Sequence, residues 1–177
     1  MSNEPTSADK GSGDPPHPRP AGEPDEVTKL RELIESTLVG MEAPYFVDKQ
    51  GNYILGLDSA RVFIVPTWIE DGPTVIRVFA ITNMDVPVTA ELTSFLLAKN
   101  LEFVVGAFAL DADAGAIWFN HNLLGEFAHK EELESSLAAV AETANTLDDE
   151  IKSRFGGRLY VEMPEEATVP PPVPGYL

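Results

Sequence analysis

Three histidines are the side chains of this sequence best suited to acid–base chemistry or metal binding. His17 lies in a proline-rich N-terminal stretch, His121 follows an apolar run and His129 stands near the start of a helical pattern. None has a second histidine or an acidic residue at the spacing of a zinc site. We therefore interpret them as structural side chains. A hydrolase that uses His121 with a nearby carboxylate is the remaining enzymatic alternative.

Two acidic segments could hold a cation, and each has a simpler explanation. Residues 111–115 begin like a calcium loop, but Gly115 and Asn122 stand where two of its oxygen ligands belong. We predict a hairpin loop there. Residues 148–150 are Asp-Asp-Glu, and successive helical side chains point in different directions. The chain has no cysteine and no phosphate-binding or serine-hydrolase motif, so we expect no cofactor and no enzymatic activity.

The charge balance excludes other classes of partner. Twelve basic residues stand against 29 acidic ones, a net charge of −17. Nucleic acids and anionic membranes both require basic surfaces, so neither is expected as a partner. The acidity serves either solubility or the reception of a basic partner. Without a long apolar run or a signal-peptide pattern, we expect a cytoplasmic protein.

Proline marks the limits of the expected domain. Of 15 prolines, six fall within residues 1–24 and five within 164–177. Proline-rich polar segments bury too little surface to offset their ordering entropy. We predict a disordered tail at 1–24, one α+β domain at 25–160, and a flexible tail with polyproline character at 161–177.

Hydrophobic periodicity predicts helices and hairpins segregated along the domain. Steps of three and four residues indicate helices, and β-branched and aromatic runs indicate strands. Segregation of this kind predicts an α+β fold with an antiparallel sheet, in the order α-β-β-β-α-β-β-α. Pro66 would place its strand at an edge or in a bulge. The expected helices begin near Pro24, Pro87 and Leu133, and the expected strands cover 45–47, 53–55, 60–69, 74–82, 101–110 and 116–121.

The expected strands are apolar on both faces. In residues 61–69, Val62 and Ile64 alternate with Phe63 and Val65, whereas a half-exposed sheet normally alternates apolar with polar. Either the helices cover both faces, or a second subunit or bound chain completes one of them. For the second case we predict partner-binding residues on the first helix and the central hairpin: Leu30, Ile34, Phe63, Val65, Trp68, Ile76 and Val78.

Four stretches of the sequence are distinctive in their order: Ser59–Ile64, Ile76–Ala80, Trp118–Gly125 and the last helix up to Ile151. Together they resemble the YbjN family, whose fold is similar to that of type III secretion chaperones. The resemblance spans roughly residues 25–155 and depends on the order of these stretches. It implies a homodimer that cradles an extended client segment against its sheet and first helix, and it carries no catalytic residues.

These observations predict a non-enzymatic chaperone or adaptor that binds a protein or peptide client on apolar sheet surface. An acidic rim around that surface would favour basic clients. The alternative is a regulatory domain that senses a small molecule in a pocket between the sheet and the long helix.

Overall fold

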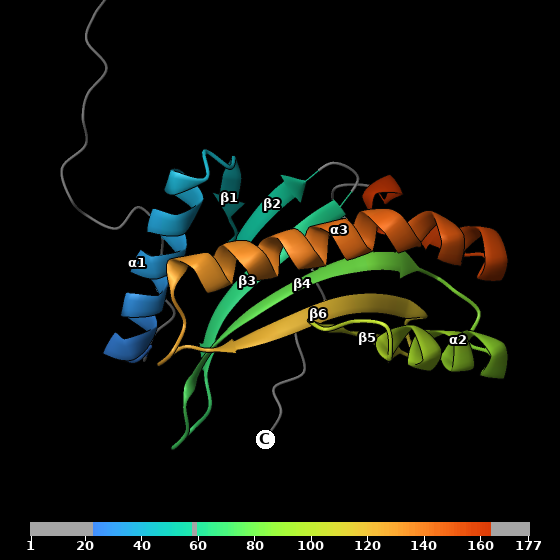
Figure 1. Ribbon diagram of the computed structural model, residues 1–177, viewed down its shortest axis with the longest axis horizontal. Coiled ribbons are helices and arrows are strands. Elements are labelled where there is room, and N and C mark those ends of the chain that lie inside the picture. Colours follow the sequence, from blue (N-terminus) through green and yellow to red (C-terminus); the bar gives the residue numbers. More distant parts are fainter. Residues whose placement is uncertain (1–22, 58–59, 164–177) are drawn as a thin grey trace, which may run out of the picture.

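A computed structural model describes residues 23–57 and 60–163 of the protein (Figure 1). The four ranges expected as strands between the first two helices are all strands, so the predicted order counted one too few there, and a short strand and a 3-10 turn follow the last helix. The predicted α+β class is confirmed, but the predicted element order lacked these pieces. The predicted tails fall almost wholly outside the described residues. The elements are α1 (Asp25–Gly40), β1 (Tyr45–Val47), β2 (Tyr53–Leu57), β3 (Ala60–Trp68), β4 (Thr74–Met84), α2 (Ala90–Asn100), β5 (Ala107–Asp111), β6 (Ala116–Leu124), α3 (Lys130–Phe155), β7 (Arg158–Leu159) and η1 (Tyr160–Glu162).

The strands form one antiparallel sheet in the order β1-β2-β3-β4-β6-β5, and β7 pairs with the end of β4. β3 is central in this order, yet β2 pairs only with its residues Ala60–Ile64. At Pro66 the strand pairs with β4 alone, opposite Ile76. The absence of a proline N–H therefore breaks no ladder, because β3 is locally an edge strand there.

The helices follow the predicted periodic pattern. α1 begins after Pro24 with two acidic residues in its first turn, where they complement the helix dipole. α3 is capped by His129, whose Nδ1 accepts a hydrogen bond from the Glu132 N–H at 3.2 Å. It ends at Gly156, which has a φ of 83°. Each helix buries one apolar stripe: Val27, Leu30, Ile34 and Leu38 in α1, and Leu133, Leu137, Val140, Ala144, Leu147 and Ile151 in α3.

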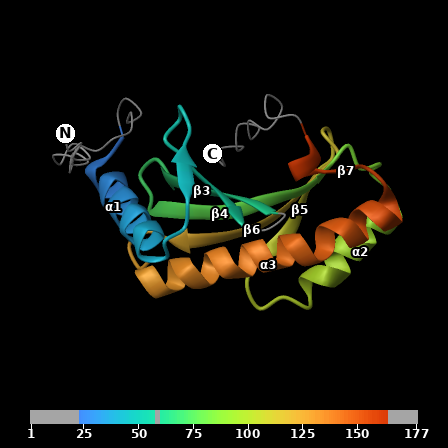
Figure 2. The same ribbon diagram turned by 90° about the horizontal axis from the view of Figure 1, so that it is seen from above.

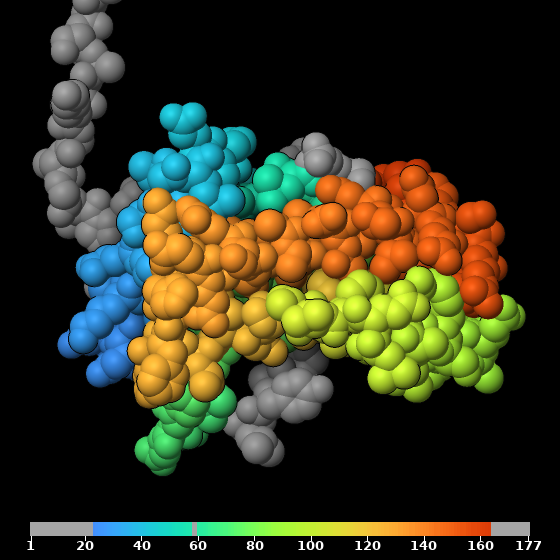
Figure 3. All heavy atoms as spheres, in the orientation of Figure 1, coloured from blue at the N-terminus to red at the C-terminus, as the bar shows by residue number. Residues whose placement is uncertain are grey.

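The two faces of the sheet are covered differently. α2 and α3 lie on one side and η1 lies on the other, while α1 crosses one end (Figure 2). The buried side chains of α1 join those of α3 in one large core. Seen from the α3 side, the three helices conceal most of the sheet, and the β3–β4 hairpin projects beyond them (Figure 3). We call this side the helix-covered face.

The predicted strand over 101–110 is wrong in its first half. α2 ends at Asn100, and its side chain then acts as a strand partner: Oδ1 accepts from the Phe108 N–H at 2.7 Å, and Nδ2 donates to the Phe108 carbonyl at 3.2 Å. These contacts delay β5 until Ala107. Val104, which the pattern placed in a strand, is fully exposed in the intervening loop.

Candidate functional site

A second apolar cluster lies on the side of the sheet opposite α3. The register aligns Ile54, Phe63 and Phe79 across β2, β3 and β4. The Phe63 and Phe79 rings stack with centroids 5.1 Å apart, and Phe79 lies 5.0 Å from Trp118 on β6. We call this surface the aromatic face, and define it by Ile54, Phe63, Phe79, Ile81, Trp118 and Tyr160.

The aromatic face combines burial with an unused hydrogen-bond donor. Phe63 and Phe79 are fully buried, and Trp118 is 8% exposed. The indole Nε1 of Trp118 is buried and has no acceptor among the described residues. A buried donor without an acceptor costs about 1–3 kcal/mol. Nε1 of Trp118 is thus an unsatisfied polar group within an apolar cluster.

The rim of this face remains accessible to a partner. Phe46 on β1 pairs with Ile54, which extends the apolar row to the edge of the sheet, and its side chain is 56% exposed. Val65 packs against the cluster and is only partly buried. An extended peptide on the aromatic face would meet these side chains first.

Two arginines lie beside the rings of the aromatic face. The guanidinium carbon of Arg61 lies 5.9 Å from the centre of the Tyr160 ring, and that of Arg77 lies 6.0 Å from the Phe79 ring. β1, β2, β3, β4 and β6 contain no aspartate or glutamate. α3, in contrast, has seven acidic and three basic side chains. The acidic rim expected from composition would have to come from the turns around the sheet, and it stays a prediction.

Tyr160 anchors the end of the described chain on the aromatic face. Its ring meets that of Phe63 edge-on, with centroids 6.0 Å apart. Burial raises the pKa of Tyr160 to about 12, and the nearby Arg61 charge opposes this shift. The phenol therefore stays neutral at physiological pH.

The structure divides the seven predicted partner-binding residues between the two faces. Leu30, Ile34, Ile76 and Val78 lie in the core under α3, whereas Phe63 and Val65 lie on the aromatic face. Trp68 lies near the tip of the β3–β4 hairpin and is 38% exposed. The seven residues therefore do not form one surface, and their role in binding stays a prediction.

Sequence reasoning did not include Phe79, Trp118 or Tyr160 in the predicted site. Phe79 and Trp118 share the alternation that placed Phe63 on one side of its strand. A strand order would have identified them, because it places β6 beside β4. Tyr160 follows the last predicted helix, where no periodic signal exists.

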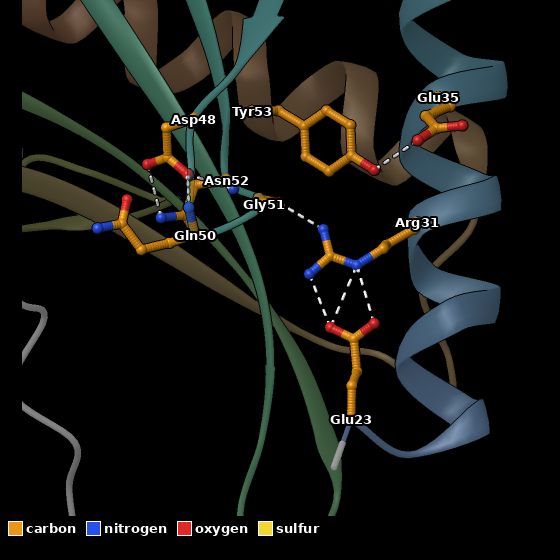
Figure 4. Close-up of polar contacts among 8 residues, drawn as sticks. All are labelled: Glu23, Arg31, Glu35, Asp48, Gln50, Gly51, Asn52 and Tyr53. Atoms are coloured by element: carbon orange, nitrogen blue, oxygen red, sulfur yellow. Dashed lines mark hydrogen bonds and ion pairs between the residues drawn. The ribbon is translucent and has the colours of Figure 1, made fainter. Parts of the chain in front are cut away.

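A polar clamp fixes α1 to the β1–β2 turn (Figure 4). Arg31 is nearly buried. Its Nη2 lies 2.7 Å from Glu23, and its Nη1 donates to the Gly51 carbonyl. Gly51 has a φ of 81°, and a Cβ there would lie 3.0 Å from the guanidinium. Tyr53 Oη donates to Glu35 at 2.8 Å, and burial, with the Glu35 hydrogen bond, raises the pKa of Tyr53 well above its usual range.

His121 does not form a catalytic site with its neighbours. Its Nδ1 lies 2.9 Å from the Ser136 hydroxyl, which lies buried on the sheet-facing side of α3. A buried hydroxyl cannot reach a substrate, so the pair is a structural link between β6 and α3. Burial lowers the pKa of His121, and the Glu132 charge opposes that shift.

The acidic segments are occupied by local structure. Asp111 accepts hydrogen bonds from the N–H groups of Asp113 and Ala114, so residues 111–115 form the predicted hairpin loop. Among residues 23–57 and 60–163, no three His, Asp or Glu side chains are grouped to hold a metal ion. Within the same ranges no helix is long and apolar enough to cross a membrane.

The space between the sheet and α3 is filled by apolar side chains. Val62, Ile64 and Val78 from the strands meet Leu137 and Val140 from α3, and all five are fully buried. This packing does not favour the alternative of a small-molecule site between the sheet and the long helix.

Comparison with known proteins identifies the family. Residues 28–163 match the family TY-Chap1, described as T3SS (YopN, CesT) and YbjN peptide-binding chaperone 1. This chain belongs to that family. The match covers most of the chain, and the predicted resemblance to YbjN and type III secretion chaperones is confirmed. No curated protein matches the sequence.

Solved structures share the fold at low sequence identity. A chain of the HopA1–SchA chaperone–effector complex superimposes with a TM-score of 0.57 and 11% identity over 72% of this chain and 98% of that chain. A chain of the ExsC–ExsE complex superimposes with a TM-score of 0.55 and 16% identity, over 70% of this chain and 93% of that chain. YbjN from E. coli superimposes with a TM-score of 0.53 and 15% identity, over 72% of this chain and 91% of that chain. At these identities the likeness establishes the fold alone.

Proposed function

We propose that this protein is a non-enzymatic peptide-binding chaperone that holds an extended client segment on the aromatic face. The observation that carries the proposal is the aromatic row, with its buried indole donor, on the side of the sheet opposite α3. Family membership supports peptide binding in general. The neighbouring structures were solved as chaperone–effector and ExsC–ExsE complexes, which supports a protein client.

The chemistry of the face favours a client segment that is apolar and neutral or acidic. Phe63, Phe79 and Trp118 would receive apolar side chains, and the Trp118 indole would donate to a client carbonyl. Arg61 and Arg77 would attract client carboxylates. The net charge of the whole chain therefore does not indicate the charge of its client.

Site-specific cross-linking tests this proposal. A photo-reactive residue at Val65 or Phe46, both on the rim of the face, should cross-link to defined segments of co-purified proteins, identified by mass spectrometry. Val39 is the matched control, because it is an exposed apolar residue on α1, away from this face. Equal cross-linking from Val39 and Val65 would contradict the assigned surface.

Substitution then tests the contribution of the face to affinity. Val65→Asp should reduce capture of the cross-linked segment at least about tenfold, because it places a carboxylate in the apolar contact. Val39→Asp should leave capture unchanged. Undiminished capture by the Val65 variant would place the client elsewhere.

We also propose that the chain forms a homodimer through the outer surface of α2. Leu97 and Leu101 lie one helical turn apart, and Leu101 is 89% exposed. Val104 follows in the adjoining loop and is also exposed. Three large apolar side chains this close together form a patch that a second copy would cover.

Light scattering after size-exclusion chromatography tests the dimer. The unmodified protein should have twice the chain mass of 19.2 kDa. The double variant Leu97→Glu with Leu101→Glu should have the mass of a single chain. Val39→Glu on α1 serves as the control. A monomer in the unmodified protein would disprove this interface and leave the peptide-binding proposal untouched. The predicted cytoplasmic location belongs to the same proposal and can be tested by fractionation.

A further inference from the structure

The described helical element on the aromatic face is much smaller than the helices on the other side of the sheet. Phe63 and Phe79 are fully buried, although α2 and α3 lie on the other side of the sheet (Figure 2). The described helical element that packs here is η1, a three-residue turn. Six strands spaced at about 4.8 Å span roughly 24 Å. One turn is too small to cover such a surface.

The path of the chain delivers a candidate cover to this face. β7 pairs with the end of β4, and Tyr160 then packs on Phe63, so the chain has crossed from α3 to the aromatic face by residue 163. The 14 residues 164–177 continue from that point. In an extended polyproline conformation they would reach about 43 Å at ~3.1 Å per residue, which exceeds the width of the sheet.

The composition of residues 164–177 complements the face. The segment contains five prolines, and proline-rich peptides bind rows of aromatic side chains in a polyproline conformation. That conformation leaves its carbonyls without internal partners, so they are available to the Trp118 indole donor. Glu165 and Glu166 are opposite in charge to Arg61 and Arg77.

We propose that residues 164–177 occupy the aromatic face of their own chain and compete with the client for it. The proposal rests on the proposed function, because it gives that site a built-in occupant. A tethered segment competes at an effective concentration on the order of millimolar. Weak or short client segments would then be excluded, and only a client with more contacts would displace the segment.

Paramagnetic relaxation in the full chain tests the contact directly. The protein has no cysteine, so Gly175→Cys provides a single site for a nitroxide label. The label should broaden the Trp118 indole N–H signal, assigned with a Trp68→Phe variant. Signals of α3 amides on the opposite side should keep their intensity. Equal intensity loss, or none, at Trp118 and α3 would overturn the proposal.

Charge reversal tests the proposed attraction between the two glutamates of the segment and the two arginines of the aromatic face. Glu165→Arg with Glu166→Arg should abolish most of the broadening at Trp118, and so should Arg61→Glu with Arg77→Glu. The four changes together should restore it. Unchanged broadening in both double variants would remove the charge pairing from the proposal, and failure of the combined variant to recover would also count against it.

A synthetic peptide of residues 164–177 separates this proposal from the proposed function. It should bind the Glu165→Arg/Glu166→Arg protein at least about tenfold more tightly than the unmodified protein, whose own segment competes. Equal affinity for both proteins would overturn the intramolecular competition. Cross-linking of a client from Val65 would be unaffected by that result, so the two ideas fail independently.

Discussion

The two faces of this sheet differ in the size of their apolar clusters and in what covers them, because the cluster under the helices has 25 buried residues and the one on the aromatic face has seven. On the helix-covered face, aliphatic residues such as Val62, Ile64 and Val78 are buried by α1 and α3. On the aromatic face, Phe63, Phe79 and Trp118 are buried beside two arginines and a turn. The core under the helices also contains rings such as Phe108 and Phe119, so the two faces differ mainly in their cover.

The separation of charge adds to this contrast. α3 is strongly acidic, while the strands of the aromatic face present arginine. The helix side therefore supplies most of the solubility and repels other acidic chains. The proposed preference for an acidic client segment depends on this difference between the two sides.

Introducing an aspartate on one face or the other should give the largest difference in stability between two variants. Val78→Asp buries a charge under α3, at a cost of several kcal/mol that rivals the total stability of about 5–15 kcal/mol. Val65→Asp, on the neighbouring strand but on the partly exposed face, should cost within about 1 kcal/mol. Circular dichroism and urea unfolding would measure both. Comparable loss of structure in the two variants would show that the faces do not differ.

Truncation of a core side chain on α3 should give the next largest effect. Leu137 is fully buried against the strands, so Leu137→Ala leaves a cavity and should cost about 2–5 kcal/mol. Val39→Ala, on the exposed surface of α1, is the matched control and should change the unfolding free energy little. A small effect at Leu137 would mean that α3 is not a fixed cover.

The clamp that holds α1 should contribute less than the core. Arg31→Leu removes charge-assisted hydrogen bonds to Glu23 and the Gly51 carbonyl, with an expected loss of about 1.5–3 kcal/mol. Lys29→Leu removes an exposed charge two residues away and should cost far less. Urea midpoints for the two variants give the comparison. If they shift equally, α1 is held by apolar contacts alone.

The sequence predicted the helices and the two-sided apolar strands because both depend on local periodicity. The ends of α1 at Gly40 and of α3 near Gly156 could be predicted because glycine leaves the helical conformation easily, and this is a property of the local sequence. Pro66 likewise lies where the ladder is one-sided.

The site was harder to predict because it depends on contacts between distant residues. Nothing local indicates that Trp118 on β6 lies beside Phe79, or that Tyr160 returns to Phe63 after α3. The same limit explains why Ile76 and Phe63 were grouped, although they lie on opposite faces. Net charge also could not show that two arginines lie beside the rings of the aromatic face while α3 carries seven acidic side chains.

The smallest expected effect is a pH dependence confined to the helix-covered face. Burial lowers the pKa of His121 below its ordinary value of 6.5, so the folded protein binds fewer protons than the unfolded chain as the pH falls through that value. Stability should therefore decrease from pH 7.5 towards pH 5.5, because the unfolded chain takes up the proton more readily than the folded protein. Urea midpoints at the two pH values should differ less for His121→Asn.

His129→Ser is the control for this measurement, because serine keeps an acceptor at the start of α3 and leaves His121 in place. Its midpoint should retain the pH dependence of the unmodified protein. If that dependence survives in His121→Asn and disappears in His129→Ser, then the start of α3, and not its packing against β6, responds to protons. The pH dependence of stability would then arise at the exposed start of α3 and not in the packed core of the helix-covered face.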